Sequence, residues 1–311
     1  ALLVTSAILQ ALAAASAYAQ QPAQQETGRL EEVTVTAQRR VEKLQDVPIA
    51  ISAFSANELE RRQITETEDI IKLVPNLYGD NSTGIGTSNN FAIRGLYNTE
   101  SLATFDSPVA LYVDNVLISR LGATNFSLFD VERIEVMRGP QGTLFGRNTT
   151  GGAISVTLAK PSTSFGGYLE ANYGNYDHIA LRGSVDVPLS DWVLTKFSGY
   201  IIDEDGYVDN LTTGGTNNGQ ESYGARGALR ISLSDDILWD VSLEYIENKD
   251  AYIWNEIVGN DRISRSGLQA LGDLVTGKKG RIPGNSNQIN SLALTSNLQV
   301  DTDVGAIEII S

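Results

Sequence analysis

The residue types that most often carry out chemistry in proteins are isolated in this sequence. Gly146 to Gly151 has the opening spacing of a phosphate-binding loop, but Gly152 and Ala153 replace the Lys and Ser or Thr which that loop needs. His178 is the only histidine, and the absence of cysteine excludes thiolate nucleophiles and thiolate metal sites. Scattered carboxylates alone do not make a glycosidase. The sequence therefore predicts no catalytic residue, no enzymatic activity and no cofactor.

One acidic group could bind a metal ion. Asp203, Glu204, Asp205 and Asp209 lie close together in a predicted loop, where they could offer oxygen ligands to Ca²⁺. Their spacing is not that of an EF-hand, and a solvated acidic loop explains them equally well. We assign no metal ligand, and Ca²⁺ binding by this loop stays open.

The chemistry that the sequence does offer is backbone pairing. Within Glu31–Arg40, Val33 and Val35 alternate with Thr34 and Thr36 between flanking charges. Alternating β-branched residues predict a short strand, here with no sequence-adjacent partner. Such a segment is either the edge strand of a sheet or a strand that another protein completes by strand addition.

Composition and the N-terminal residues restrict the class of protein. The 311 residues carry a formal net charge of −15, which argues against nucleic-acid binding. Residues 1–19 are almost all small or apolar and end in Ala17-Tyr18-Ala19, a small-x-small cleavage pattern. We predict a signal peptide over 1–19, with a membrane anchor as the alternative, and then a flexible polar leader over 20–43. No later run approaches the ~20 apolar residues of a spanning helix.

Residues 44–160 have the pattern of a small α/β domain. Capping-box spacing at Ser55–Glu58 and at Thr65–Glu68 predicts two helices, and Pro75 should end the second of them. Between loops rich in Gly and Asn, strand-like runs occur at Phe91–Arg94, Val109–Val113, Ile134–Met137 and Ala153–Thr157. These strands and helices must position any site in this half of the chain.

From residue 166 to residue 311 the pattern changes to strands alone. Ile179–Val187, Tyr223–Leu233 and Ile237–Tyr245 each divide into one apolar and one polar face. Runs of about nine to eleven residues match tilted strands that cross a bilayer, whereas a soluble β-sandwich usually has strands of five or six. We predict about seven antiparallel strands of a transmembrane β-barrel that is incomplete in this chain, with the remaining strands beyond Ser311.

The connections support the same architecture. Tight turns near Ser190, Asp235 and Thr302 alternate with the long connections 203–220 and 248–287, a pattern typical of outer-membrane barrels. Aromatic residues near both ends predict two interfacial girdles: Trp192 and Trp239 beside the short turns, and Tyr173, Tyr200, Tyr223 and Tyr245 near the long loops.

The residues from Phe129 to Ile154 resemble the plug signature of the TonB-dependent outer-membrane receptor family. They include Glu132-Arg133-Ile134-Glu135-Val136, Arg138-Gly139-Pro140, Leu144-Phe145-Gly146 and Gly151-Gly152. Val47–Val74 with Pro75, Ile93-Arg94-Gly95 and Tyr173–Tyr176 are similar to further landmarks of the family. A TonB-box-like segment occupies Glu32, Val33, Thr34, Val35, Thr36 and Ala37. The resemblance covers essentially the whole chain.

This resemblance implies a fold and a function. The family's plug fills a barrel of about 22 strands in the bacterial outer membrane, and its box binds the TonB protein of the inner-membrane energising complex in the periplasm. Arg94 and Arg138 match family arginines that clamp the plug to barrel glutamates. Six residues match the plug apices expected to face the substrate: Asn89, Asn90, Tyr97, Asn98, Thr99 and Arg120.

The expected function is active transport of a scarce, large substrate, and the expected substrate is a metal chelate. A ferric siderophore is the first candidate. Cobalamin, nickel chelates, haem and oligosaccharides are the alternative substrates within the family. A passive channel or an adhesin is the alternative from another class, but neither needs a box or a plug signature. Receptors that also signal carry an extra domain before the box, for which the residues between Ala19 and Glu31 leave no room.

Overall fold

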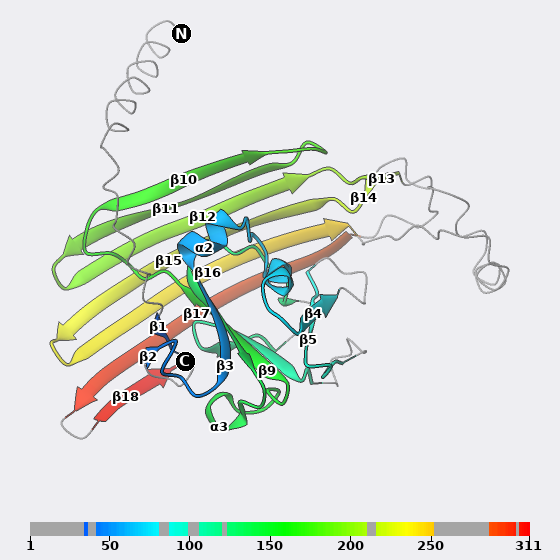
Figure 1. The fold of residues 1–311 in the computed structure, drawn as a ribbon. Coiled ribbons are helices and arrows are strands. Elements are labelled where there is room, and N and C mark those ends of the chain that lie inside the picture. The colour runs from blue at the N-terminus through cyan, green and yellow to red at the C-terminus, as the bar shows by residue number, and fades with distance from the viewer. Residues whose placement is uncertain are drawn as a thin grey trace, which may run out of the picture. The chain divides into compact units, whose positions relative to one another are not determined.

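The computed structural model describes residues 34–36, 42–80, 87–98, 106–119, 123–209, 216–251, 286–302 and 305–311. The predicted signal peptide lies outside these ranges, and so do Glu32, Val33, Ala37, Thr99 and Arg120. The described residues form an α/β domain and a separate antiparallel sheet (Figure 1). None of the helices among them is long and apolar enough to cross a membrane.

A five-stranded sheet with the order β3-β8-β9-β6-β7 is the centre of the α/β domain. The pairing of β6 with β9 is parallel, and the other pairings are antiparallel. The strands are β3 (Ala50–Ser55), β6 (Val109–Val113), β7 (Val116–Leu117), β8 (Val131–Arg138) and β9 (Gly152–Leu158). Two small sheets accompany it: β1 (Thr34–Val35) with β2 (Glu42–Lys43), and β4 (Leu77–Asp80) with β5 (Asn90–Ile93).

Both faces of the central sheet are buried, which explains the continuous apolar runs of its strands. Ile134 and Val136 pack into the larger core, whereas Met137 joins a smaller cluster on the opposite face. The predicted strands β5, β6, β8 and β9 are confirmed, but β3 and β4 were not predicted because their short runs lack a clear alternation.

The two predicted helices are present with different ends. Helix α2 (Ala56–Arg61) starts after Ser55, but the Ser55 side chain makes no capping hydrogen bond. The second is a 3₁₀ helix, η1 (Thr67–Lys72), capped by Glu66 and Asp69 one residue later than the predicted box. A third, short helix, α3 (Gly142–Phe145), lies in the loop between β8 and β9.

The second half of the chain forms one seven-stranded antiparallel sheet, as predicted, with its strands in sequence order. The strands are longer than expected because their polar ends continue beyond the apolar runs. They are β10 (Gly166–Tyr173), β11 (Ile179–Ser190), β12 (Val193–Glu204), β15 (Gln220–Ser234), β16 (Ile237–Ala251), β17 (Ser286–Thr302) and β18 (Gly305–Ile310). A small hairpin, β13 (Val208–Asp209) with β14 (Thr216–Asn217), projects from the β12–β15 connection.

The predicted division of each strand into an apolar and a polar face is confirmed, and the structure shows which face is exposed. On β15, Ser222 and Arg226 are buried on the polar face, whereas Tyr223 and Leu233 are exposed on the apolar face. The apolar face therefore lies outside, where a bilayer would cover it, and the polar face lies toward the α/β domain. One girdle assignment was wrong: Tyr200 is 3% exposed and its ring packs 4.8 Å from that of Phe129, because its strand alternates poorly in sequence.

Gly152→Ala should loosen the α/β domain, because a Cβ there would lie 2.3 Å from the Met137 carbonyl oxygen and 2.7 Å from Ile93. Gly142→Ala is the matched control, since a Cβ at Gly142 meets nothing within 4 Å. We expect the first change to lower the free energy of opening β8 and β9 by about 1–3 kcal/mol, and the second to leave it nearly unchanged. Hydrogen exchange of β8 and β9 in the full-length protein measures both, and equal effects would contradict the close approach.

Candidate functional site

The short N-terminal strand has a partner, which corrects the expectation that it has none nearby. Thr34 and Val35 pair with Lys43 and Glu42 in an antiparallel ladder of two residues. The Val35 side chain is only 1% exposed. In this structure the strand is therefore docked, not free.

A buried carboxylate fixes the end of this strand. Glu135 is completely buried, and its Oε1 accepts hydrogen bonds from the Thr36 backbone N–H at 2.8 Å and from the Thr36 hydroxyl at 3.2 Å. Arg133 donates from Nε to the same oxygen at 3.0 Å, and from Nη2 to the Thr36 hydroxyl at 3.1 Å. Because the Glu135 carboxylate pairs with the Arg133 guanidinium at 3.0 Å, these bonds are charge-assisted and stronger than neutral ones.

The alternation of β8 explains this arrangement. Ile134 and Val136 point to the larger core, so Arg133 and Glu135 must point to the opposite face of the sheet. That face is where Thr36 arrives, 99 residues away in sequence. The strand is thus held by Arg133 and Glu135, two residues of the segment that resembles the plug signature.

A second group of charges joins the α/β domain to the inner face of the seven-stranded sheet. Asp130 Oδ1 lies 3.0 Å from Nζ of Lys196 on β12, which is also 3.4 Å from Asp186 on β11. Arg226 on β15 lies 3.4 Å from Asp114 and 3.8 Å from Asp130. The side chains of Lys196, Arg226 and Asp130 are less than a tenth exposed, so water screens these pairs little. We call these five residues the charged seam.

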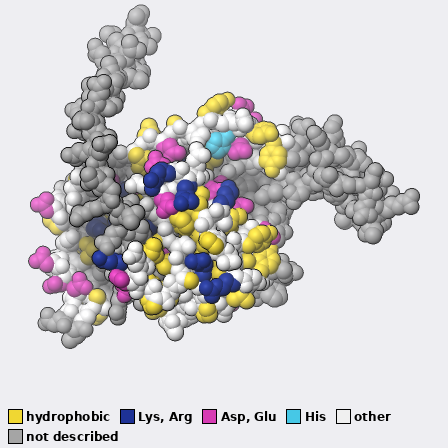
Figure 2. Space-filling model, in the orientation of Figure 1, with side chains coloured by type: hydrophobic (Ala, Val, Ile, Leu, Met, Phe, Trp, Pro, Cys, Tyr) yellow, Lys and Arg dark blue, Asp and Glu magenta, His cyan; other side chains and the backbone are white. Residues whose placement is uncertain are grey.

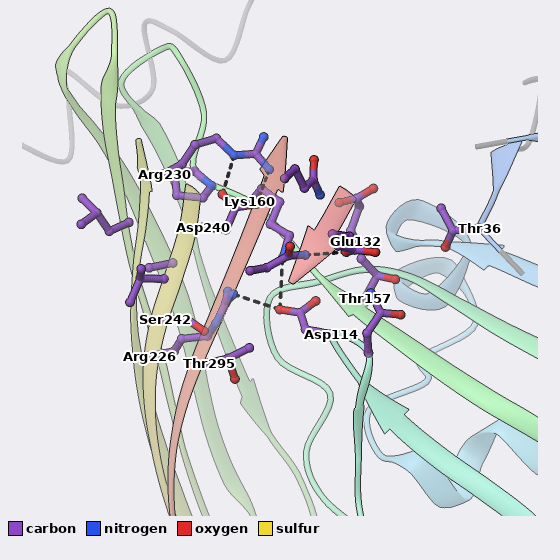
Figure 3. A pocket seen from close by; sticks show the side chains of 18 of the residues that line it. Thr36, Asp114, Glu132, Thr157, Lys160, Arg226, Arg230, Asp240, Ser242 and Thr295 are labelled. Atoms are coloured by element: carbon purple, nitrogen blue, oxygen red, sulfur yellow. Dashed lines mark hydrogen bonds and ion pairs between the residues drawn. The ribbon is translucent and has the colours of Figure 1, made fainter. Parts of the chain in front are cut away.

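The two plug aspartates of the seam, Asp114 and Asp130, both have positive φ. Asp114 and Asn115 both have positive φ, 46° and 68°, and form the two-residue turn between β6 and β7. The Asp114 carboxylate also accepts from the Leu158 N–H at 3.0 Å and lies 3.2 Å from Lys160. Figure 3 shows Asp114 between Lys160 and Arg226. On the face of the molecule seen in Figure 2, acidic and basic side chains are likewise interspersed.

An apolar contact supports the seam. Phe129 of the α/β domain packs with Ala180, Tyr200 and Ile202 of the sheet, with Ile246 beside them. Since each ring buries a large apolar area, this cluster gives the interface a packed centre that charge pairs alone would lack.

Polar groups of the α/β domain also gather at the end of the sheet that carries the long connections. Gln220, at the start of β15, donates to Glu66 at 3.1 Å, and Glu66 accepts from Asn125 at 3.0 Å. Burial raises the pKa of Glu68, and the neighbouring Glu66 carboxylate adds to that rise. For Asp69 burial acts in the same direction, but hydrogen bonds from Lys72 and from backbone N–H groups outweigh it and lower its pKa.

An aromatic pair lies near this end. The rings of Tyr78 and Tyr97 are 6.3 Å apart in an edge-to-face arrangement, and the Tyr97 hydroxyl donates to Asp80 at 2.6 Å. Tyr78 is 59% exposed, so a large aromatic face remains open to a ligand. Tyr78 was not among the predicted residues, because nothing in its short strand, β4, marks it as part of a site.

Comparisons with known proteins find relatives that have an α/β domain and an antiparallel sheet of this kind. Residues 43–153 match the TonB-dependent Receptor Plug Domain family. The pesticin receptor of Yersinia pestis is 27% identical over 220 residues, covering 68% of this chain and 32% of that protein. The ferric yersiniabactin uptake receptor FyuA from Yersinia pestis has a similar structure, with a TM-score of 0.69 at 23% identity over 82% of this chain and 39% of that chain. Residues 43–153 therefore form a TonB-dependent receptor plug domain, and the chain is similar to outer-membrane receptors over 68% of its length.

A transporter of another substrate is equally similar. The vitamin B12 transporter BtuB of Vibrio vulnificus strain YJ016 is 28% identical over 242 residues, covering 76% of this chain and 38% of that protein. The chain spans about a third of the length of these relatives. The α/β domain is accordingly the plug, and the seven-stranded sheet is a part of the receptor's β-barrel wall that is not closed within this chain.

The predicted clamp of Arg94 and Arg138 stays a prediction, because the barrel glutamates that would complete it were expected mostly beyond this chain. Arg94 lies against Gly139, and Arg138 lies on β8 with its Nε unpaired, so neither meets a described barrel carboxylate. In the observed pairs between plug and barrel, the plug supplies the aspartates and the barrel supplies the cations, whereas the predicted clamp has arginines on the plug. Sequence reasoning placed Arg226 on the polar face of its strand, but it could not place Lys196, whose strand alternates poorly, and could not find the distant partners of either cation.

The predicted substrate residues separate into two groups. Asn89 and Asn90 were expected to face the extracellular cavity, but both are buried, at 0% and 1% exposure. The Asn89 backbone exchanges two hydrogen bonds with the Thr124 hydroxyl, at 2.8 Å and 2.7 Å. Tyr97, one of the aromatic pair, and Asn98 next to it are half-buried, while Thr99 and Arg120 lie outside the described residues.

Lys196→Met should weaken the docking of the plug, because it leaves the Asp130 and Asp186 carboxylates without their cation in a buried place. We expect a loss of about 3–5 kcal/mol in the stability of β8, measured by hydrogen exchange in the full-length receptor. Adding Asp130→Asn should recover part of that loss. Lys249→Met is the control, since Lys249 is 42% exposed and pairs only within the wall, where about 1 kcal/mol or less is expected. Equal losses at both lysines would contradict the seam.

Proposed function

We propose that the receptor containing this chain performs TonB-dependent active transport of a scarce, large substrate across the bacterial outer membrane, with a ferric siderophore as the first candidate. The observation that supports this most is the docked strand. Thr36 is held by Glu135 of the plug, and it lines the same cavity as Asp301 and Ala306 at the short-turn end of the sheet. The Glu66–Gln220 contact is at the long-loop end. A substrate face and a coupling strand would thus lie at opposite ends of one plug.

The proposed location of the receptor follows from the positions of the short-turn end and the long-loop end of the sheet. The barrel wall would lie in the outer membrane with its apolar face in lipid, the long loops outside the cell, and the TonB-box-like strand in the periplasm. TonB, driven by its inner-membrane energising complex, would pair with this strand by strand addition. Because β1 and β2 share only two residue pairs, an incoming strand can replace β2 at low cost.

Substrate choice has two supported candidates. A ferric siderophore is supported by the similarity to FyuA, described as a ferric yersiniabactin uptake receptor, and cobalamin by the similarity to a vitamin B12 transporter. Nickel chelates, haem and oligosaccharides stay alternatives within the family. A passive channel or adhesin has no use for a plug fixed to the wall by a buried seam, so we do not favour it. Titration of the purified full-length receptor with a ferric siderophore and with cobalamin distinguishes the first two.

Val35→Pro should abolish energy-dependent uptake while leaving substrate affinity within about twofold, because proline lacks the backbone N–H that a paired strand needs. Uptake of labelled substrate by cells and its binding to purified receptor are the two measurements. Val35→Ile keeps the donor and the β-branched shape, and should transport normally. Uptake at the wild-type rate in the proline variant would mean that the coupling segment lies elsewhere or that the receptor is a passive pore.

Glu135→Gln separates docking from coupling in the same assay. Loss of the charged acceptor weakens the bonds to Thr36, yet it leaves the strand itself able to pair with TonB. We therefore expect uptake to persist in this variant, in contrast to the proline variant, while hydrogen exchange at Val35 and Thr36 speeds up.

Tyr97→Ala combined with Arg120→Ala should weaken binding of an anionic, aromatic-bearing chelate by about 2–4 kcal/mol if both contacts are desolvated. Tyr97→Phe keeps the ring and loses only the bond to Asp80, so most of the affinity should remain. Affinity is measured on purified full-length receptor beside a hydrogen-exchange check of plug folding. Unchanged affinity in the double variant would place recognition in the barrel loops.

A further inference from the structure

Two cavities lie between the plug and the inner face of β15–β17. The larger has a volume of ≈ 710 Å³ and reaches Thr36, Asp301 and Glu308 at the short-turn end. The smaller has a volume of ≈ 130 Å³ and reaches Asn125 and Asn248 toward the long-loop end. Both are lined by Asp114, Arg226, Ser242 and Thr295, so they meet at these four residues.

An ion pair stands at this meeting point. Arg226 reaches across from the wall to Asp114 on the plug, with Nη2 3.4 Å from Oδ2, as Figure 3 shows. Its Nη1 donates to the Ala159 carbonyl oxygen at 3.2 Å. The two side chains are 2% and 9% exposed. The pair lines both cavities at the place where they adjoin.

The plug side of this closure is a short turn that the Leu158 N–H and Lys160 also hold, so moving it breaks those contacts too. Asp114 sits in a two-residue turn with positive φ, and β7 beyond it has only two residues at the edge of the sheet. Strands this short and unpaired on one side open at low free-energy cost. Arg226 also has a second possible partner, since Glu244 lies directly opposite it on β16 and lines the smaller cavity. Displacement of the turn therefore need not leave a buried guanidinium without a counter-charge, which would be costly.

We propose that the two cavities form one passage along β15–β17 and that the Asp114–Arg226 pair is the gate that closes it. The role of this passage in transport rests on the function proposed above. A space of ≈ 130 Å³ is well below the roughly 300 Å³ at which pockets begin to hold drug-sized ligands. Water and small ions pass when the pair alone is broken, and the substrate passes only when the turn has also moved.

Conductance of the full-length receptor in planar lipid bilayers tests the gate without substrate or TonB. Arg226→Gln and Asp114→Asn should each raise the basal conductance to potassium chloride about tenfold or more, as loss of a buried pair would predict. Arg226→Lys keeps the charge and should stay nearly closed. Arg230→Gln removes the same charge from the larger cavity but breaks a 2.7 Å pair with Asp240 made within the wall, so it should also stay closed. Equal conductance in Arg226→Gln and Arg230→Gln would overturn the gate.

A cysteine introduced into the passage tests whether the substrate moves through it. Ser242 is half-buried and lines both cavities, and the chain has no cysteine of its own. A bulky methanethiosulfonate reagent on Ser242→Cys should block uptake with unchanged affinity, and a reductant should restore uptake. A thiol that does not react, or labelling that leaves uptake intact, would contradict the passage. If wild-type uptake proves independent of TonB, the proposed function fails while the conductance result still decides the gate.

Discussion

A cation buried on the inner face of the barrel wall needs a counter-charge, and much of this structure depends on the plug supplying one. Arg226 and Lys196 lie on the inner faces of β15 and β12, where their side chains are 2% and 9% exposed. Isolated charges in such places would be strongly unfavourable. Asp114 and Asp130 supply the compensation from two turns of the plug that only positive φ makes possible. The position of the plug against the wall is therefore defined by charge as well as by the apolar contact of Phe129 with Tyr200.

Strand β8 connects this interface to the coupling strand. Asp130, immediately before β8, is bonded to the wall, while Glu135, within β8, is bonded to Thr36. Ile134 and Val136, on either side of Glu135, fix β8 in the core. Force applied to the coupling strand thus reaches a strand that is tied to the wall at one end. The edge strand β3, by contrast, pairs only with β8 and could separate first.

The sequence predicts what depends on local alternation and misses what depends on distant pairing. The inner and outer faces of β11, β15 and β16 follow from period-two patterns and are confirmed. The burial of Tyr200 was missed because its strand alternates poorly, and the partner of Val35 because a two-residue ladder leaves no pattern. The charged seam was unpredictable for a different reason: a buried Lys reads like any polar-face residue until the plug lies opposite. Arg94 and Arg138 illustrate the converse, since their motif is clear but their expected partners are not among the described residues.

A polar seam also suits an interface that has to change during each transport cycle. Buried ion pairs contribute little net stability compared with apolar packing, but they specify one arrangement and exclude others. Here each cation has a second acidic neighbour on the wall, Asp186 beside Lys196 and Glu244 opposite Arg226. When the plug aspartates move away, these neighbours can pair with the cations, so neither charge is left buried without a partner. An apolar seam of the same area would offer no such exchange, because separating it would expose its full surface to water.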